Sequence, residues 1–321
     1  MYRMGRMCMT ERQQARVLSA WLTGLTVVTV VQLWCPGQME PQSLVVTDEV
    51  GGGQEVVVSP STPHDVVEVL LEGPLDAADN RLVAWLRQGG GDRIFPPSDL
   101  PYNITVDNTG GWRDSPVWKF YVKMINSYFG KKEEGFFVEA GALDGVLLSP
   151  TLALEQHLSW TGLLVEPRPD MFQQLLHKHR RAHAARFCLS DNSYPHKTSF
   201  WMSPDYVKES VAYSAVGSQL LNKVHPEQRE TGNVVTVHCM PLLSLLKALD
   251  RTHIDLFVLD VEGVEWGVID LFPFDKITVD MLAVERKYKG EDDREAFIHM
   301  IQSKGFTLTA SLKEDFVFVR D

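Results

Sequence analysis

The sequence predicts a doubly wound α/β domain over residues 135–321, because short apolar runs alternate there with amphipathic stretches of helical length. Such alternation is typical of a parallel sheet covered on both faces. We expect a mostly parallel sheet with an antiparallel C-terminal edge strand. The predicted strands are Phe136 to Ala140, Gly162 to Glu166, Ala184 to Leu189, Ile254 to Asp260, Thr278 to Val284, Phe306 to Thr309 and Phe316 to Val319. The predicted helices are Leu147 to His157, Asp170 to Arg180, Leu242 to Leu249, Val264 to Leu271 and Arg294 to Lys304.

Composition and charge exclude several classes of protein. The 321 residues, 44% of them hydrophobic, can bury one large core with appendages. A net charge of −11 opposes a phosphate backbone, so we expect no nucleic-acid partner. The four cysteines form no C-x-x-C pair, and no zinc site is predicted. Cys188 and Cys239 either form a disulfide in an oxidising compartment or stay as two buried thiols.

The segment 17–35 carries no charge and, at about 1.5 Å per residue, nearly matches the roughly 30 Å of a bilayer core. Four arginines and one acid precede it, so the positive-inside rule predicts a cytosolic tail at 1–16 and a translocated remainder. A cleaved signal peptide and a buried core helix are the alternatives. Trp34-Cys35-Pro36 lacks the small residues of a cleavage site, which favours an uncut signal anchor of a single-pass type II membrane protein.

Two regions separate this anchor from the α/β domain. Residues 36–65 are rich in Gly, Pro, Ser and Val without helical periodicity, which predicts a flexible stalk. Residues 66–134 predict an N-terminal helical extension, with a helix at Val66 to Arg87. Asn103-Ile104-Thr105 matches the N-glycosylation triplet, which would be a site in a translocated loop or a chance occurrence.

Ligands of an open parallel sheet bind beyond the carboxyl ends of its strands, so the residues ending each strand indicate the chemistry. The first strand ends in Glu139 and continues through Gly141, Asp144 and Gly145, where glycines allow a sharp turn and close approach to a ligand or serve only as a tight turn. The second strand ends in Glu166, which can accept both hydroxyls of a ribose.

Further acids end the later strands. Ser190 and Asp191 follow the third strand, either beside an adenine ring or as a capped turn. Asp260 and Glu262 follow the fourth strand, and Glu285 ends the fifth. Helix capping would explain acids at such positions. A cationic sulfonium ligand also explains them, because acidic walls that repel a pyrophosphate attract S-adenosylmethionine.

Three separated motifs resemble the FkbM-type methyltransferase domain, over roughly the last 190 residues. They are Phe137 to Gly145, Trp160 to Pro167, and Leu259 to Glu265. His238 to Leu246 and Asp315 to Val319 are similar to the arthropod Star-like branch of that family. The sequence departs from the family pattern at Glu139 and Leu143, and from the Star-like pattern at Pro150.

The FkbM resemblance implies a Rossmann-like fold, S-adenosylmethionine as methyl donor, and O-methylation of a glycan or small molecule. It implies that the methionine part is lined by Glu139, Gly141, Asp144 and Gly145, the ribose by Glu166, and the base by Ser190 and Asp191. Asp260 and Glu262 would face the transferred methyl group and act in catalysis, with His238 as a further candidate base or a structural imidazole.

The Star-like resemblance implies a single-pass membrane protein with a lumenal domain that acts in vesicle-mediated trafficking of membrane protein cargo between endoplasmic reticulum, Golgi and endosome, or at the plasma membrane. This trafficking role is our prediction for the whole protein, and an active O-methyltransferase is the alternative. A surface-anchored binding module that kept only the fold is a third reading.

Overall fold

The computed structural model describes residues 75–88, 93–104, 111–204 and 217–321, together with the backbone of four short strands between residues 16 and 58. It divides into two units, Met1–Gly73 and Pro74–Asp321. The first unit contains an antiparallel sheet of strands β1 (Arg16–Trp21), β2 (Val27–Gln32), β3 (Leu44–Asp48) and β4 (Val56–Val58).

The predicted anchor at 17–35 and stalk at 36–65 lie outside the described residues, apart from these strand backbones. No helix of the described part is both long and apolar enough to span a bilayer. The anchor and its orientation therefore stay predictions.

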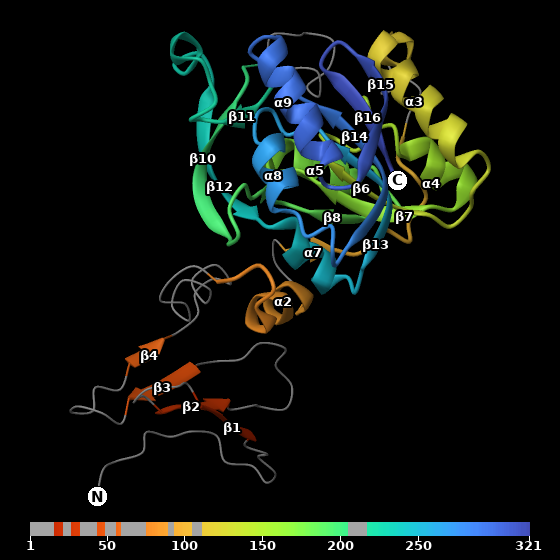
Figure 1. Ribbon diagram of the computed structural model, residues 1–321. Coiled ribbons are helices and arrows are strands. Elements are labelled where there is room, and N and C mark those ends of the chain that lie inside the picture. Colours follow the sequence, from red (N-terminus) through yellow and green to blue (C-terminus); the bar gives the residue numbers. More distant parts are fainter. Residues whose placement is uncertain are drawn as a thin grey trace, which may run out of the picture. The chain divides into compact units, whose positions relative to one another are not determined.

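The second unit is built on an eight-stranded sheet in the order β15-β16-β14-β13-β6-β7-β8-β5 (Figure 1). Five neighbouring strands, from β14 to β8, run parallel, whereas β16 and β5 are antiparallel to their neighbours. The strands are β5 (Ile94–Phe95), β6 (Phe136–Ala140), β7 (Thr161–Val165), β8 (His183–Ala185), β13 (His253–Leu259), β14 (Thr278–Glu285), β15 (Phe306–Leu312) and β16 (Asp315–Arg320). The predicted mixed, mostly parallel α/β fold is confirmed.

Helices cover both faces of this sheet, as expected for strands that are buried almost throughout. One face packs against α3 (Pro116–Phe129), α4 (Leu152–Leu158) and α5 (Pro169–His177), whose apolar side chains share a core with Phe137, Leu164 and Met281. On the other face, ring contacts link α8 (Glu265–Leu271) to α9 (Glu291–Gln302) and α9 to Phe316.

A second, four-stranded sheet is inserted in the chain between β8 and β13, and the sequence did not predict it. Its order is β11-β10-β12-β9, with β9 (Cys188–Leu189), β10 (His196–Met202), β11 (Gln219–Leu220) and β12 (Asn233–Met240). Cys188 and Cys239 face each other where β9 pairs with β12, and they form a disulfide across a Cα distance of 4.3 Å. The open question of two thiols or one disulfide is thus answered for this structure.

Three predicted elements differ from the structure. The single strand Ala184 to Leu189 is two strands, because the chain leaves the main sheet after Ala185 and pairs with β12 instead. The antiparallel C-terminal strand exists, but β16 lies between β14 and β15 and is not at the edge. The helix expected from Leu147 begins only at Leu152, because the Asp144 carboxylate accepts the N–H groups of Val146 and Leu147 and fixes a turn.

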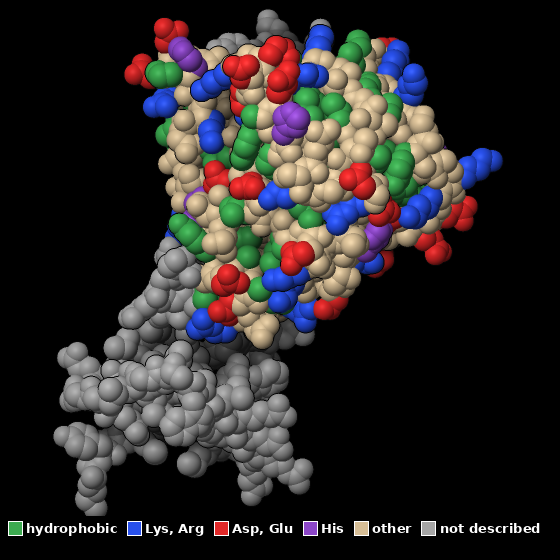
Figure 2. All heavy atoms as spheres, viewed as in Figure 1, with side chains coloured by type: hydrophobic (Ala, Val, Ile, Leu, Met, Phe, Trp, Pro, Cys, Tyr) green, Lys and Arg blue, Asp and Glu red, His purple; other side chains and the backbone are tan. Residues whose placement is uncertain are grey.

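Of the predicted helix Val66 to Arg87, residues 75–87 are described, and only Asn80 to Arg87 are helical, because the Asp79 side chain accepts the Arg81 N–H and caps the helix there. Helix α2 (Asn80–Arg87) packs on α7 (Leu242–Ala248), where Arg87 donates to the carbonyl oxygens of Lys247 and Ala248. On the face shown in Figure 2, acidic and basic side chains are interspersed over the described surface without one continuous basic area.

Candidate functional site

A cavity lies at the switch point of the main sheet. Strands β7 and β8 lie on one side of β6, and β13 and β14 lie on the other side. The chain therefore leaves β6 and β13 in opposite directions along the sheet. This is where open α/β sheets bind ligands. Gly141, Glu166 and Asp260 all line the same cavity. The predicted convergence of these three strand ends is therefore present.

The Gly141 backbone makes this edge compact. Its φ is +87°, a left-handed conformation that side chains disfavour, and a Cβ there would collide with the Asp260 carbonyl oxygen. The Gly141 N–H donates to the Val165 carbonyl at 3.0 Å, and the Asp260 N–H donates to the Ala140 carbonyl at 3.0 Å. Glycine at 141 thus lets the loops after three strands meet at one point.

Glu166 is held at the cavity wall by backbone donors. Its Oε2 accepts the Leu143 N–H at 2.9 Å, and its Oε1 accepts the Arg168 N–H at 2.8 Å. Burial raises the pKa of this carboxyl to about 7, although both N–H groups favour its charged form. Each oxygen keeps acceptor capacity beyond these two bonds, which suits a pair of ribose hydroxyls.

The other residues predicted around the first strand have different surroundings. Glu139 lines the cavity, but its Oε2 accepts hydroxyl hydrogen bonds from Ser149 and Thr151, and burial raises its pKa against these bonds and the Arg180 charge. Asp144 is buried and forms an ion pair with Lys178 at 3.3 Å. Neither Asp144 nor Gly145 is among the described residues that line the cavity.

Ser190 and Asp191 are likewise not among the described lining residues. The Ser190 hydroxyl donates within its own turn, to the carbonyl oxygens of Asn192 and Tyr194. Asp191 packs closely against Gly267. Ser190 and Asp191 thus form a turn here, and the neighbouring Phe187 and Leu189 line the cavity.

Acids gather at the far end of the cavity, where a second cavity adjoins it. Asp260, Glu262 and Glu285 line both cavities. Glu262 forms an ion pair with Lys287 at 2.6 Å. Glu265 accepts the Gly263 N–H at 2.8 Å, and burial raises its pKa against the backbone donors.

The remaining acids of this group have raised pKa values. Burial and the charges of Glu285 and Glu262 hold the pKa of Asp260 well above its usual value. Burial, with Asp315 and Glu262, raises the pKa of Glu285 to about 7. Burial also raises the pKa of Asp315 to about 6, although the Tyr121 hydroxyl donates to it. Carboxyl groups near neutrality in a cleft are the groups expected for proton transfer.

Several lining residues were not predicted from the sequence. Apolar and aromatic side chains come from the second sheet and from α3, namely Phe187, Leu189, Phe200, Leu220, Val117, Trp118 and Tyr121. The inserted sheet gives no motif that marks it as a wall of the site. Glu285 was identified as the acid that ends the fifth strand but was given no role in the site, although the strand-end rule applies to it equally.

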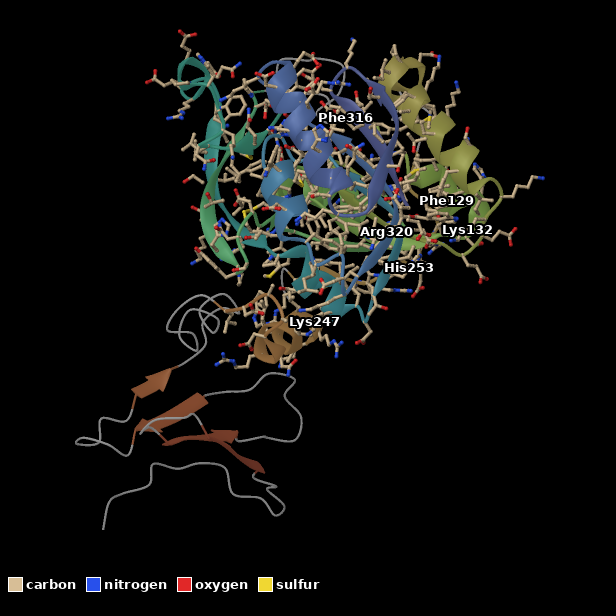
Figure 3. All side chains as sticks on the ribbon, viewed as in Figure 1. Phe129, Lys132, Lys247, His253, Phe316 and Arg320 are labelled. Atoms are coloured by element: carbon tan, nitrogen blue, oxygen red, sulfur yellow. A yellow bond between two sulfur atoms is a disulfide. The ribbon has the colours of Figure 1, made fainter. Side chains whose placement is uncertain are left out.

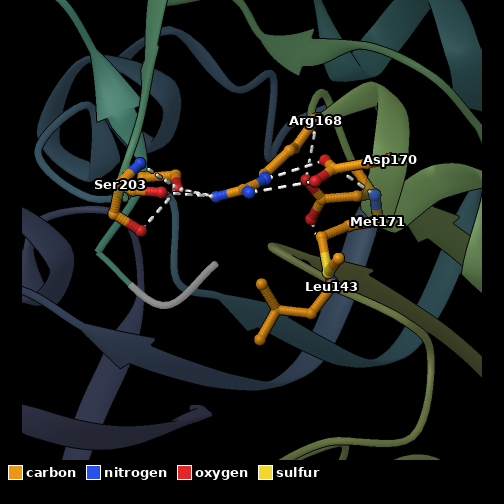
Figure 4. A network of polar contacts seen from close by, with 7 residues as sticks. Leu143, Arg168, Asp170, Met171 and Ser203 are labelled. Atoms are coloured by element: carbon orange, nitrogen blue, oxygen red, sulfur yellow. Dashed lines mark hydrogen bonds and ion pairs between the residues drawn. The ribbon is translucent and has the colours of Figure 1, made fainter. Parts of the chain in front are cut away.

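Arg168 ties this second sheet to the main one (Figure 4). Its guanidinium binds both carboxylate oxygens of Asp170, at 2.7 and 2.9 Å, and donates to the Ser203 carbonyl and the Ser218 hydroxyl. The backbone N–H of Arg168 also donates to Glu166. This one buried residue therefore holds the Glu166 carboxylate and, through its guanidinium, the second sheet. The N–H of Met171 and that of Leu143 complete the network drawn there.

His238, the further candidate base, lies in β12 opposite Lys197 and is not among the described lining residues of either cavity. A different histidine has acidic neighbours at the opposite edge of the sheet. His253 Nε2 lies 3.4 Å from Asp255 and 3.3 Å from Asp280, and Lys132 reaches the same carboxylates (Figure 3).

A comparison with known families shows to which family this α/β domain belongs. The model of the methyltransferase FkbM domain matches residues 139–308, more than half of the chain. The chain belongs to the FkbM methyltransferase family. No curated protein matches the sequence significantly. Among solved structures, a candidate RNA methyltransferase from Pyrococcus horikoshii is similar with 12% identity and a TM-score of 0.36, covering 75% of this chain and 94% of that one.

The FkbM match extends from Glu139 in β6 to the start of β15 and so includes the glycine turn, Glu166 and Asp260. Methyltransferase activity in this family implies S-adenosylmethionine as donor. The described residues fit that group: Glu166 has acceptor capacity for a ribose, apolar side chains suit a flat base, and the acids at the far end suit a sulfonium cation.

Proposed function

We propose that the FkbM domain is an S-adenosylmethionine-dependent O-methyltransferase of a glycan or small molecule. One observation carries this proposal: Gly141, Glu166 and Asp260 line one cavity whose far end is acidic and opens to a second cavity. A dinucleotide would place phosphates near these acids, and their charge would oppose it. A sulfonium ligand gains from the same charge.

The chain's own residues have separate roles in this proposal. Glu166 accepts the ribose hydroxyls, and the backbone at Gly141 allows close approach. The apolar walls exclude water from the cavity, which strengthens electrostatic interactions inside it. When bound, S-adenosylmethionine supplies an electrophilic methyl group. Asp260 and Glu285 stand where the two cavities meet, so a hydroxyl entering from the second cavity would meet carboxyl groups able to accept its proton.

Calorimetric titration of the full-length chain with S-adenosylmethionine tests this function. We expect binding in the wild type and a loss of about 10- to 100-fold in affinity for Glu166→Gln, because a charge-assisted hydrogen bond contributes about 1.5–3 kcal/mol. The exposed Glu295→Gln on α9 is the matched control and should bind as the wild type does. Absence of binding at millimolar ligand would remove the enzyme proposal.

We further propose that the protein is a Star-like, single-pass membrane protein whose domain lies in the secretory pathway and takes part in trafficking of membrane protein cargo. The apolar segment 17–35 and its arginines support the orientation. The Cys188–Cys239 disulfide supports an oxidising compartment, since cytosolic disulfides are rare. The exposed Asn103 supports a lumenal domain that could be glycosylated.

Expression in a secretory host separates the two locations. A lumenal domain predicts a glycosidase-sensitive mass shift that disappears in Asn103→Gln, and alkylation of Cys188 and Cys239 only after reduction. An unmodified Asn103 together with alkylation of Cys188 and Cys239 before reduction would contradict translocation. The trafficking role is tested by deleting the gene. A membrane protein that co-purifies with this protein should then stay in the endoplasmic reticulum, whereas its normal transport would exclude the trafficking role.

A further inference from the structure

Two acids of the main sheet, Asp260 and Glu285, line both cavities, and the reversed strand β16 places a third acid, Asp315, next to Glu285. Asp260 follows β13, Glu285 ends β14, and Asp315 begins β16. Since β16 is antiparallel, its first residue lies at the edge where β13 and β14 end, and Asp315 stands opposite Glu285 in the register. Three strands thus carry an acid at this edge of the sheet, and two of these acids, Asp260 and Glu285, line both cavities.

Four basic residues line the second cavity, namely Lys223, Arg286, Lys287 and Lys289. Lys287 forms an ion pair with Glu262, and Arg286 forms one with Asp293. Among the ion pairs between described residues, none includes Asp260, Glu285 or Asp315. Asp260 and Glu285 therefore lie together in both cavity walls with only part of their charge compensated.

We propose that Asp260 and Glu285 act as one proton-exchanging pair, which releases a proton when S-adenosylmethionine binds and takes up the proton of the acceptor hydroxyl when the methyl group is transferred. This inference rests on the proposed methyl transfer. It explains why neither acid has its own cationic partner: the ligand supplies the positive charge. The pair is a catalytic group, because it contacts both the donor cavity and the acceptor cavity.

The step balances in atoms and charge. The sulfur–methyl bond breaks and its electron pair stays on sulfur, while the hydroxyl oxygen forms the new bond to the methyl carbon. The O–H bond breaks, and its proton goes to the carboxylate pair. A sulfonium and a carboxylate before the reaction become a neutral thioether and a neutral carboxyl group after it, so the buried site carries no unbalanced charge at either stage.

Other charged groups face the pair and must be considered in its titration. Burial with the neighbouring acids raises the pKa of Asp260 and Glu285, and Lys287 lowers both. The facing groups are Glu262 from the loop after β13, Glu265 from α8, Lys287 after β14, Glu314 and Asp315 at β16, and Tyr121 from α3. Glu262 is paired with Lys287, and Glu265 lines the second cavity but not the first, so the exchangeable proton is assigned to the other two acids that line both cavities.

Calorimetry of the full-length chain in phosphate and in Tris at pH 7 measures the proton directly, because the two buffers differ in ionisation heat. S-adenosylmethionine should release about half to one proton, and its affinity should fall by about 10-fold or more between pH 7.5 and 5.5. S-adenosylhomocysteine, which has the same shape without the charge, should release none and bind nearly equally at both pH values.

Variants assign the proton to the pair. Glu285→Gln should lose most of the proton release while it binds S-adenosylhomocysteine within about 2-fold of the wild type, and Glu295→Gln should retain the release. Equal proton release by both ligands, release by neither, or full release in Glu285→Gln overturns the pair while leaving the proposed function in place. Failure of both ligands to bind overturns the proposed function itself.

Discussion

The two edges of the main sheet both carry acidic clusters, but only one of them is neutralised. At the amino edge, Asp255 accepts the Phe136 N–H at 2.7 Å and bonds Lys132, with His253 close by. Burial opposes its charge, yet these partners outweigh burial and hold its pKa below the usual value. At the carboxyl edge, Asp260, five residues later, has its pKa held well above the usual value by burial and neighbouring acids.

The difference separates structural acids from acids available for chemistry. Asp255 has donors from two other elements and so joins β13 to the loop before β6. Asp260 and Glu285 line cavities, and no ion pair between described residues includes them. Strand β13 thus carries an acid that stabilises the fold, and the residue that follows it is an acid without an ion pair among the described residues. Perturbed carboxyl groups in a cleft indicate function, whereas paired ones indicate stability.

The largest expected effect on stability comes from adding a side chain at Gly141, at the carboxyl edge. Gly141→Ala should lower the free energy of unfolding by more than about 3 kcal/mol, because strain at positive φ and the overlap with the Asp260 carbonyl act together. Denaturant unfolding measures it. Gly130→Ala, near the amino edge, is the control: its φ is +59° with no atom within 4 Å of the added Cβ, so about 1 kcal/mol is expected. Equal losses in the two variants would show that the contact with Asp260 is unimportant.

Replacing each of the two aspartates by alanine is the next test of the difference between the two edges. Asp255→Ala should lower the free energy of unfolding by about 2–3 kcal/mol, because it leaves the buried Phe136 N–H unpaired and removes the partner of Lys132. Asp260→Ala should change stability by less than about 1 kcal/mol and weaken S-adenosylmethionine binding. The comparison is wrong if Asp260→Ala proves the more destabilising of the two.

The pH dependence of stability should show a smaller effect of the same origin. Glu166 and Glu285 have pKa values of about 7 in the folded protein, above the 4.5 of the free group. Between these values the folded state binds more protons than the unfolded state, so stability is greatest below about pH 5 for these groups and is lost as pH rises through 7. Asp255 acts in the opposite sense, but only near and below pH 4.

Thermal unfolding between pH 5.5 and 8 measures this loss. We expect the free energy of unfolding to fall by on the order of 1–2 kcal/mol between pH 5.5 and 8, which lowers the Tm by about 3–6 °C. This range allows for the coupling between the acids and for their contact with solvent. Glu285→Gln should reduce the difference. A Tm that rises from pH 5.5 to 8 would contradict the assignment of raised pKa values to these acids.

Most of the fold could be predicted because its strands are buried on both faces and therefore appear as continuous apolar runs, as in Leu256 to Leu259. The second sheet was missed although β12 is rich in β-branched residues, which favour a strand. Its partners β9 and β11 have only two residues each, too few to give a sequence pattern. The acids at Glu166 and Asp260 were found from strand ends alone. The position of Asp315 next to Glu285 was not predicted, because only the reversed direction of β16 brings its first residue to that edge.

The placement of β16 also determines when the site can assemble during synthesis. Strand β15 pairs with β16 alone, so it has no place in the main sheet until the ribosome has released the strand that follows it. The strand that borders Glu285 in the sheet is thus made after every described residue that lines the cavity. Nascent chains stalled before Asp315 should consequently resist proteolysis at β6 and β13 but fail to retain S-adenosylmethionine.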